Sequence, residues 1–209
     1  MTSPSPLEFG QYYHIYNRGN NREDLFFDVR NYQHFLDLYA RYIPTVADTY
    51  AYCLLRNHFH FLVRIKTEEE QELTLRVSET LRVSGRFKPK RPSQQFGNLF
   101  NAYAKAINKA YDRTGSLFET PFGRVLVSSE SHLVHLVVYI HQNPQKHGLV
   151  TSFDTWPHSS YCALLSWQPT RLEREEVLPW FHGPAAFREA HRGAAAEARI
   201  APLVAGDVD

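Results

Sequence analysis

The hydrophobic positions along the chain follow two different periods, and each period predicts one kind of element. Segments rich in β-forming residues that end at turn-forming residues predict strands. These segments are 12–17, 49–55, 58–65 and 123–128. Apolar residues spaced three and four apart predict helices over 31–43, 95–113 and 129–143. The expected helix stops are Pro44, Gly115 and Pro144, and Arg56-Asn57 predicts a tight hairpin turn.

The predicted order is strand, helix, strand, strand, helix, strand, helix. This order is typical of an antiparallel sheet with helices packed on it, which is an α+β sandwich. The polar stretch 66–94 contains Arg86-Phe87-Lys88-Pro89-Lys90-Arg91-Pro92, and prolines among cations favour an extended, mobile loop over a helix. We therefore expect one domain over 1–165 with a basic loop insertion at about 66–94, and an extension of unknown role over 166–209.

Composition narrows the class of protein. A chain of 209 residues with 43% hydrophobic residues can bury the core of one domain. The sequence has no apolar run long enough to predict a membrane span, and its first ten residues lack the pattern of a signal peptide. Two cysteines, Cys53 and Cys162, are too few for a disulfide scaffold. We therefore expect a cytoplasmic location and no membrane partner.

The net charge of +1 conceals a basic region. Residues 73–124 hold ten Lys or Arg against three Asp or Glu, which is a net charge of +7 in a quarter of the chain. A locally basic stretch in a nearly neutral protein is typical of a nucleic-acid interface. An ordinary solvated surface explains the same charges, so charge alone leaves both interpretations open.

Candidate metal ligands lie on the third predicted strand, in Asn57-His58-Phe59-His60-Phe61. Residues two apart on a strand point to one face, so His58 and His60 would project together while the phenylalanines enter the core. Two imidazoles on one side of a rigid strand form half of a site for a divalent cation. On this interpretation neither histidine needs burial, so replacing either should leave the fold intact. The alternative is two polar residues on a solvated face.

The last predicted helix offers a nucleophile. Its polar stripe consists of His132, His135, Tyr139 and Asn143, because positions three or four apart share a helix face. A phenol with a pKa near 10 attacks a phosphodiester only when a cation polarises the phosphate. Tyr139 as nucleophile and Asn143 as an oxygen ligand meet this need, with Mg²⁺, Mn²⁺ or Zn²⁺ as the metal. The alternative is a tyrosine at the edge of the core and Asn143 as a helix terminator.

Four motifs occur in chain order. They are Tyr13-His14-Ile15-Tyr16-Asn17-Arg18-Gly19, then His58-Phe59-His60 within 54–63, then Tyr139-Ile140-His141-Gln142-Asn143-Pro144, then Trp156 with Ser159-Ser160-Tyr161. In this combination they resemble the single-tyrosine HUH transposases, and the last motif resembles the REP-associated tyrosine transposase branch. The resemblance spans about 9–161, and the segment beyond Trp167 has no counterpart in it.

The resemblance implies a ferredoxin-like antiparallel sheet and strand transfer on single-stranded DNA through a covalent 5′-phosphotyrosine. By motif position, Tyr139 would be the nucleophile. The divalent metal, Mg²⁺ or Mn²⁺, would be held by His58, His60 and Asn143, the last of which stands where many relatives carry Gln. A second hypothesis is a non-catalytic descendant that binds DNA hairpins. If Tyr139 is not the nucleophile, the alternatives are Tyr103 and Tyr111.

Both hypotheses imply single-stranded DNA with a hairpin as the partner, bound by a monomer or a homodimer. The basic loop follows the strand of His58 and His60, so we expect it to contact backbone phosphates beside the site, with Arg18 adding a contact. The candidate DNA-binding residues are Arg18, Arg82, Arg86, Lys88, Lys90, Arg91, Lys105 and Lys109.

Overall fold

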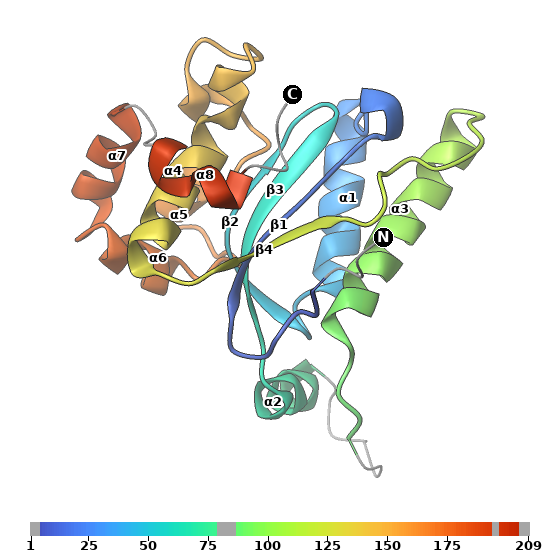
Figure 1. The fold of residues 1–209 in the computed structure, drawn as a ribbon, viewed down its shortest axis with the longest axis horizontal. Helices are drawn as coiled ribbons and strands as arrows, with labels where there is room; N and C mark the ends of the chain where they lie inside the picture. Colours follow the sequence, from blue (N-terminus) through green and yellow to red (C-terminus); the bar gives the residue numbers. More distant parts are fainter. Residues whose placement is uncertain (1–4, 79–86, 194–196, 205–209) are drawn as a thin grey trace.

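A four-stranded antiparallel sheet with the strand order β2-β3-β1-β4 forms the centre of the molecule (Figure 1). The computed structural model describes residues 5–78, 87–193 and 197–204. The strands are β1 (Tyr12–Arg18), β2 (Ala47–Leu54), β3 (His58–Ile65) and β4 (Gly123–Val127). β1 and β3 are the inner strands, so each has a neighbouring strand on both sides. The predicted α+β class with an antiparallel sheet is confirmed.

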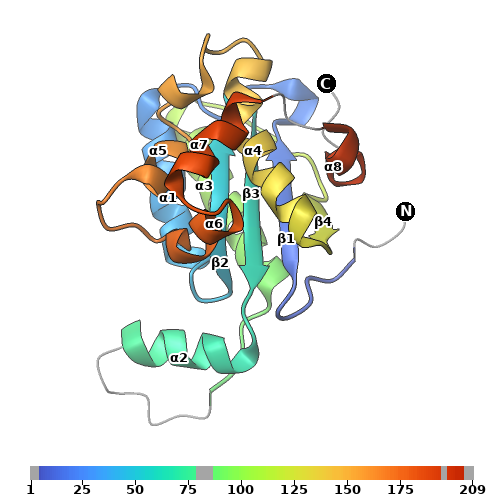
Figure 2. The same cartoon turned by 90° about the vertical axis from the view of Figure 1, so that its left-hand side faces the viewer.

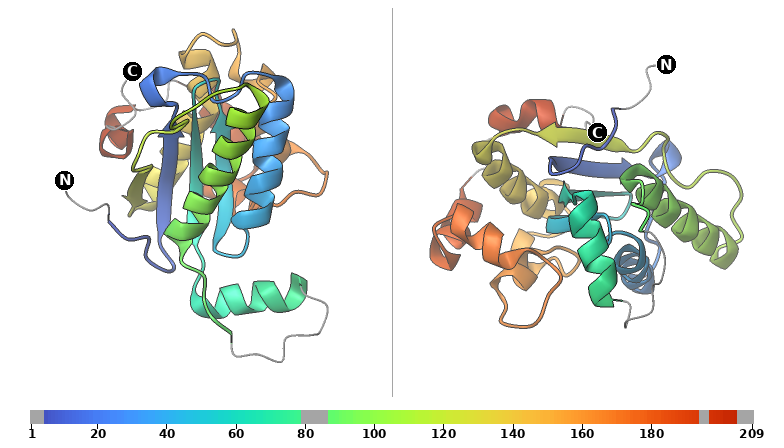
Figure 3. Two further views of the ribbon diagram at one scale, coloured as in Figure 1. Left: turned by 90° about the vertical axis from the view of Figure 1, so that its right-hand side faces the viewer. Right: turned by 90° about the horizontal axis from the view of Figure 1, so that it is seen from below.

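Two long helices, α1 (Val29–Tyr42) and α3 (Pro92–Ala110), lie side by side over one face of the sheet (Figure 3, left). Their apolar sides meet the alternate residues of β1 and β3 in an aromatic core. In this core the ring of Phe35 lies 5.2 Å from that of Phe59 and 6.3 Å from that of Phe61, measured between centroids. This face of the sheet is therefore a packed interior.

The helix α4 (Glu130–Lys146) crosses the other face, and the C-terminal part of the chain folds around it (Figure 2). The surrounding elements are η2 (Phe153–Thr155), α5 (Tyr161–Leu165), α6 (Arg174–Trp180), α7 (Pro184–Arg192) and α8 (Glu197–Val204). Phe187 and Leu203 belong to the same buried cluster as Tyr139. The extension expected after residue 165 is therefore part of the layer that covers this face.

A helix replaces part of the loop expected over 66–94. α2 (Glu68–Ser78) begins with three glutamates, which complement the positive end of the helix dipole. Arg64 of β3 donates a hydrogen bond to Glu70 at 2.6 Å and so ties α2 to the end of the sheet. The prolines that suggested a loop lie after α2, and Pro92 begins α3, where a missing N–H costs no hydrogen bond.

α4 also runs past its expected stop. The prediction ended this helix at Asn143 because Pro144 lacks an N–H, but the helix continues to Lys146. Pro144 lies in the last turn, where few hydrogen bonds remain to be lost, and the His147 N–H still bonds to the Asn143 carbonyl at 2.9 Å. This extra turn brings Lys146 to the ring of Tyr139 and His147 to the ring of His58.

The remaining predicted elements are present, with shifted ends. The helix expected from residue 31 begins at Val29, and the helix expected over 95–113 begins at Pro92 and ends at Ala110. The tight turn between β2 and β3 is confirmed by a 2.9 Å hydrogen bond from the Leu55 N–H to the His58 carbonyl. A short turn of 3-10 helix, η1 (Asn20–Arg22), follows β1. Within the described ranges, none of the helices is both long and apolar enough to cross a bilayer.

Candidate active site

The alternation predicted for β3 is confirmed. His58 and His60 lie on the face of the sheet that α4 covers, with their ring centroids 5.1 Å apart, while Phe59 and Phe61 enter the core under α1. Both histidines are buried, with 3% and 0% of their surface exposed. The alternative of a solvated polar face is therefore wrong. The expectation that neither histidine needs burial is also wrong, because α4 and the strands on either side enclose them.

Tyr139 of α4 packs against this pair. Its ring centroid lies 5.8 Å from that of His60, with the two planes nearly perpendicular at 77°. The ammonium of Lys146 lies 5.2 Å from the centre of the same ring. The structure thus brings the predicted nucleophile beside one of the two predicted metal ligands. His132 and His135, nearer the start of α4, are half-buried members of the predicted stripe.

Asn143 lies one turn after Tyr139. Its Nδ2 donates to the Tyr139 carbonyl at 3.0 Å, and its Oδ1 is buried and accepts no hydrogen bond from the described residues. One turn further, the ring of His147 lies 4.8 Å from that of His58. Residues four apart lie on one face of a helix, so Tyr139, Asn143 and His147 form a row along α4. Tyr139 contacts His60 and His147 contacts His58, and Asn143 therefore lies between these two contacts. Its buried oxygen suits the predicted role of an oxygen ligand.

Hydrogen bonds orient both histidine rings. The Nδ1 of His58 lies 2.7 Å from the Oδ1 of Asn57, and because an amide oxygen only accepts, this nitrogen carries a proton, so in the neutral ring the lone pair is on Nε2. The Nδ1 of His60 lies 3.1 Å from the Nε2 of His14. Burial lowers the pKa of His60 well below its usual value, and the positive charges near it lower it further, so this ring is neutral at pH 7. Neutral imidazole is the form that binds a metal.

Among the described residues, no group of three His, Cys, Asp or Glu side chains has the geometry to hold a metal ion. The set of two imidazoles and one amide oxygen is consistent with that finding. Three such ligands leave coordination positions on a metal ion for oxygen atoms of a substrate or of water. The chemistry of the donors therefore fits a divalent cation that accepts both nitrogen and oxygen ligands.

The predicted DNA-binding residues lie at different places. Arg18 is paired with His58 across the β1–β3 ladder, so the two share a face, and its charge is one of those that lower the pKa of His60. Lys105 and Lys109 are exposed on α3, under the opposite face. The segment that follows α3 returns to the end of β1, where the Glu119 N–H bonds to the Arg18 carbonyl at 3.0 Å. Arg18 is thus the candidate cation beside the histidines.

The basic loop is at the other end of β3, which corrects its expected position. β3 has eight residues, so His58 and Ile65 are about 23 Å apart at 3.3 Å per residue. α2 and the segment 87–91 lie beyond Ile65 (Figure 2). Lys88, Lys90 and Arg91 therefore do not lie beside the histidines, and Arg82 and Arg86 fall outside the described residues.

The two alternative nucleophiles are far from the histidines. Tyr103 is buried under the opposite face of the sheet, where its hydroxyl donates to the Leu25 carbonyl at 2.7 Å. Burial raises the pKa of Tyr103. Tyr111, at the end of α3, packs against Phe27 with ring centroids 4.7 Å apart. Neither phenol can share a phosphate with His60.

Three residues near the site were missed from the sequence. Lys146 and His147 were overlooked because the helix was expected to end at Asn143, although the spacing of His147 from Tyr139 is two turns of the same row. His14 belongs to the first of the four motifs, but no role was assigned to it from the sequence. Its position on the histidine face follows from the period of β1, since Tyr16 is paired with His60.

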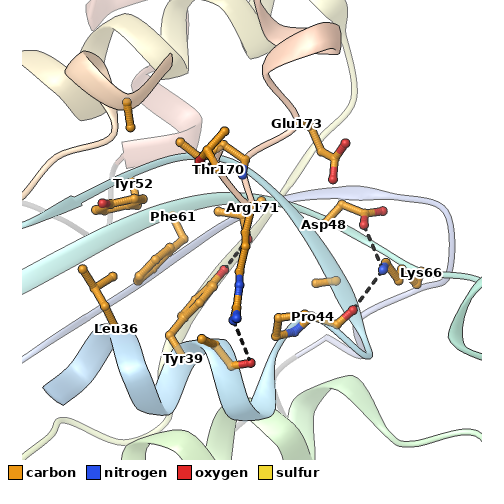
Figure 4. Close-up of a pocket in the computed structure, with 15 residues that line it drawn as sticks. Leu36, Tyr39, Pro44, Asp48, Tyr52, Phe61, Lys66, Thr170, Arg171 and Glu173 are labelled. Carbon is orange, nitrogen blue, oxygen red and sulfur yellow. Dashed lines mark hydrogen bonds and ion pairs between the residues drawn. The ribbon is translucent and has the colours of Figure 1, made fainter. Parts of the chain in front are cut away.

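A cavity of about 270 Å³ lies elsewhere, between α1, β2 and the segment 170–173 (Figure 4). Tyr39 and Phe61 line its apolar part, and an ion pair between Asp48 and Lys66 at 3.1 Å lies at its edge. Because Phe61 and His60 point to opposite faces of β3, this cavity is separated from the histidines by the sheet.

Known proteins resemble this chain in sequence and in fold. No family model matches the chain. A protein of Haemophilus influenzae that carries the name REP-associated tyrosine transposase is 28% identical over 114 residues, which is 54% of this chain and 58% of that protein. A solved structure of a REP-associated tyrosine transposase bound to a REP hairpin superposes with a TM-score of 0.55 at 15% identity, covering 83% of this chain and 93% of the other. Over about half of its length the chain is thus similar in sequence to a protein named a REP-associated tyrosine transposase, and it shares the fold of a solved structure of that name.

Proposed function

We propose that this protein is a DNA strand transferase that cleaves and rejoins single-stranded DNA at sites flanked by a hairpin, with Tyr139 as the nucleophile. The observation that carries this proposal is the contact between Tyr139 and His60, whose ring centroids are 5.8 Å apart on the inner face of the α4 layer. A core tyrosine has no need of two buried histidines and an amide oxygen beside it. The likeness to a transposase that was solved with a REP hairpin supports hairpin DNA as the partner.

The metal ligands in this proposal are His58, His60 and Asn143, and the metal is Mg²⁺ or Mn²⁺. The buried Asn143 Oδ1, which accepts no hydrogen bond from the described residues, supports the fit, because an unsatisfied buried oxygen costs about 1–3 kcal/mol unless a ligand satisfies it. When bound, the cation would supply Lewis acidity to the scissile phosphate. Imidazole ligands favour Mn²⁺ over Mg²⁺.

The reaction of Tyr139 balances without any further reagent. The phenolic oxygen attacks the phosphorus, the bond from phosphorus to the 3′ oxygen breaks, and the phenolic proton ends on that 3′ oxygen. The product is a 5′-phosphotyrosine and a free 3′ hydroxyl. Attack by a second 3′ hydroxyl restores the phosphodiester and the phenol. Lys146, 5.2 Å from the Tyr139 ring, and Arg18 are positive charges that would attract the phosphate to this place.

Access to the nucleophile requires a movement in this proposal. Only 3% of the surface of Tyr139 is exposed, and Asn143 is fully buried. A phosphodiester is larger than any opening that such burial leaves, so part of the cover over Tyr139 must move when DNA binds. Attack also requires an unpaired scissile strand, which makes duplex DNA a poor substrate and a hairpin with single-stranded flanks a good one.

The basic loop takes a different role from the one its sequence position suggested. Its described cations, Lys88, Lys90 and Arg91, follow the far end of β3, about 23 Å from His58. About seven base pairs of duplex span that length at 3.4 Å per pair. The loop therefore suits the stem of the hairpin, whereas Arg18 suits the single-stranded flank beside the scissile phosphate.

The test is the formation of a covalent adduct that resists denaturation. The full chain is mixed with a labelled hairpin oligonucleotide in Mn²⁺ and analysed on a denaturing gel, beside Tyr139→Phe and the matched variant Tyr111→Phe. We expect an adduct with the parent and with Tyr111→Phe, and none with Tyr139→Phe, which still binds the hairpin. Hairpin binding by the parent without any adduct would instead support the non-catalytic hairpin-binding hypothesis.

A further inference from the structure

His14 is a buried histidine with two hydrogen-bond partners from distant parts of the chain. It lies on β1, on the same face as His60, and none of its surface is exposed. Its Nε2 is 3.1 Å from the Nδ1 of His60, and its Nδ1 is 2.8 Å from the carbonyl oxygen of Leu203. The two imidazole rings are stacked, with centroids 5.3 Å apart. This chain of contacts links the last described helix to a predicted metal ligand.

The order of donors and acceptors along this chain follows from elementary chemistry. A carbonyl oxygen only accepts, so the Nδ1 of His14 donates to Leu203. Burial away from water disfavours an imidazolium, so the Nε2 of His14 carries a lone pair and accepts. The partner nitrogen, the Nδ1 of His60, must then carry the proton. A neutral imidazole has one N–H, so the lone pair of His60 is on Nε2, the nitrogen left for a metal.

The Leu203 carbonyl can accept the hydrogen bond from His14 because it lies at the end of α8. α8 ends at Val204, so Leu203 is in its last turn, where carbonyl groups have no partner within the helix. The N–H of His14 satisfies one of these carbonyls. The side chains of Ile200 and Leu203 are buried in the same cluster as Tyr139, which holds the helix in place. The carbonyl that accepts from His14 is thus on a helix packed against the layer of the nucleophile.

We infer that His14 is a positioning residue, which holds His60 in the tautomer with its lone pair on Nε2, the form that can bind the metal, and that α8 is part of the active site through its Leu203 carbonyl. This inference rests on the metal site in the proposed function and adds a residue and a segment to it. Partners of this kind, bonded to the second nitrogen of a ligating histidine, typically change metal affinity tenfold to a hundredfold.

The first test needs no variant. In the metal-free full chain with ¹⁵N-labelled histidine, two-bond ¹H–¹⁵N correlation spectra distinguish the two tautomers of each neutral ring. We expect His60 with its proton on Nδ1 and a scalar coupling across the hydrogen bond between His60 Nδ1 and His14 Nε2. A proton on Nε2 of His60, or the lack of that coupling, overturns the inference.

The second test compares Mn²⁺ affinity by calorimetry for three variants. His14→Phe keeps a ring but has no acceptor, and its affinity should fall about tenfold or more. His14→Gln keeps an acceptor oxygen near the position of Nε2 and should recover most of the loss. His34→Phe, an exposed histidine on α1, should match the parent. Equal affinity in His14→Phe and the parent overturns the positioning role alone, whereas a parent that binds no Mn²⁺ overturns the proposed metal site together with this role.

Discussion

The ring of Tyr139 on α4 lies 5.8 Å from the ring of His60 on β3, and the two side chains come from parts of the chain that meet only in the folded protein. Both are buried, with 3% and 0% of their surface exposed. The stability of this layer and the geometry of the candidate site therefore depend on the same residues. A substitution at the site is expected to affect folding as well as chemistry.

His60→Ala should destabilise the protein as well as abolish adduct formation. The change leaves the Nε2 of His14 without its donor in a buried setting, which costs about 1–3 kcal/mol. Urea unfolding, followed by tryptophan fluorescence, measures this loss. The exposed His34→Ala is the control and should stay within about 0.5 kcal/mol of the parent. A His60→Ala variant as stable as the parent would contradict a buried hydrogen bond between His14 and His60.

Asn143→Leu should impair metal binding and adduct formation while leaving the stability of the protein nearly unchanged. Leucine has the same branching of heavy atoms as asparagine. It removes a buried oxygen that accepts no hydrogen bond from the described residues, and it also removes the hydrogen bond from Nδ2 to the Tyr139 carbonyl. Because the two effects have opposite signs, the free energy of unfolding should stay within about 1 kcal/mol of the parent, while Mn²⁺ affinity and the yield of adduct fall. Calorimetry with Mn²⁺ and urea unfolding are the two measurements. A loss of stability with full Mn²⁺ affinity would show that the side chain is structural.

The fold was largely predictable because the periods in the sequence are local. β3 alternates histidine with phenylalanine, and that alternation fixes which residues share a face whatever covers them. The burial of His58 was not predictable, because the cover comes from α4, about eighty residues later in the chain. α2 was predicted as a loop because prolines follow it in the sequence. Its three glutamates in the first turn and its arginine in the last turn are, however, a typical pattern for a short helix.

The histidine pair and the tyrosine of the candidate site were predictable from the sequence, but the residues that hold them in place were not. His58-Phe59-His60 and Tyr139 stood out because their chemistry is unusual at such spacing. His14 did not, since its role depends on Leu203, which no local pattern in β1 can indicate. The helices after residue 165 had no recognisable motif, and their importance follows only from what they pack against.

Stability should fall on acidification because of a second pair of buried histidines. The Nδ1 of His141 on α4 lies 2.8 Å from the Nε2 of His191 on α7, and His191 donates from Nδ1 to the Phe187 carbonyl at 2.7 Å. Burial lowers the pKa of His191 to about 4, and burial with the neighbouring His191 lowers the pKa of His141. Both rings are neutral in the folded state and bind protons more readily when unfolded. Their stabilisation is therefore complete above about pH 6.5 and is lost as the pH falls towards 4.

The expected loss from His191 alone is about 3 kcal/mol between pH 6.5 and 4. Urea unfolding at several pH values across this range measures it. His191→Gln keeps an acceptor for His141 but does not titrate, so its stability should depend less on pH by about that amount. An identical pH dependence in the parent and the variant would contradict the assignment of the acid sensitivity to this pair.

The contribution of the basic loop to DNA binding should depend on the length of the hairpin stem. Lys88, Lys90 and Arg91 follow the end of β3 that is about 23 Å from His58, which corresponds to about seven base pairs. Replacing all three with Gln should reduce the salt slope of binding by about 2 to 3 for a long stem, at about 0.9 per lost phosphate contact. The same variant should match the parent on a stem of four base pairs.

Arg18→Gln is the matched control for this measurement, because Arg18 shares a face with His58. It should lower affinity on long and short stems alike, and fluorescence anisotropy at a series of salt concentrations measures both effects. A loop variant that weakens binding equally on every stem length would place the loop beside the flank, against the geometry of β3.

The central claim is that Tyr139 forms the covalent bond to DNA, and mass spectrometry of the adduct tests it most directly. The full chain is incubated with Mn²⁺ and a hairpin oligonucleotide, the adduct is digested with nuclease and protease, and the nucleotide-bearing peptide is sequenced by fragmentation. We expect a 5′-phosphonucleotide on the oxygen of Tyr139. A nucleotide on any other residue, Tyr103 and Tyr111 included, would contradict it.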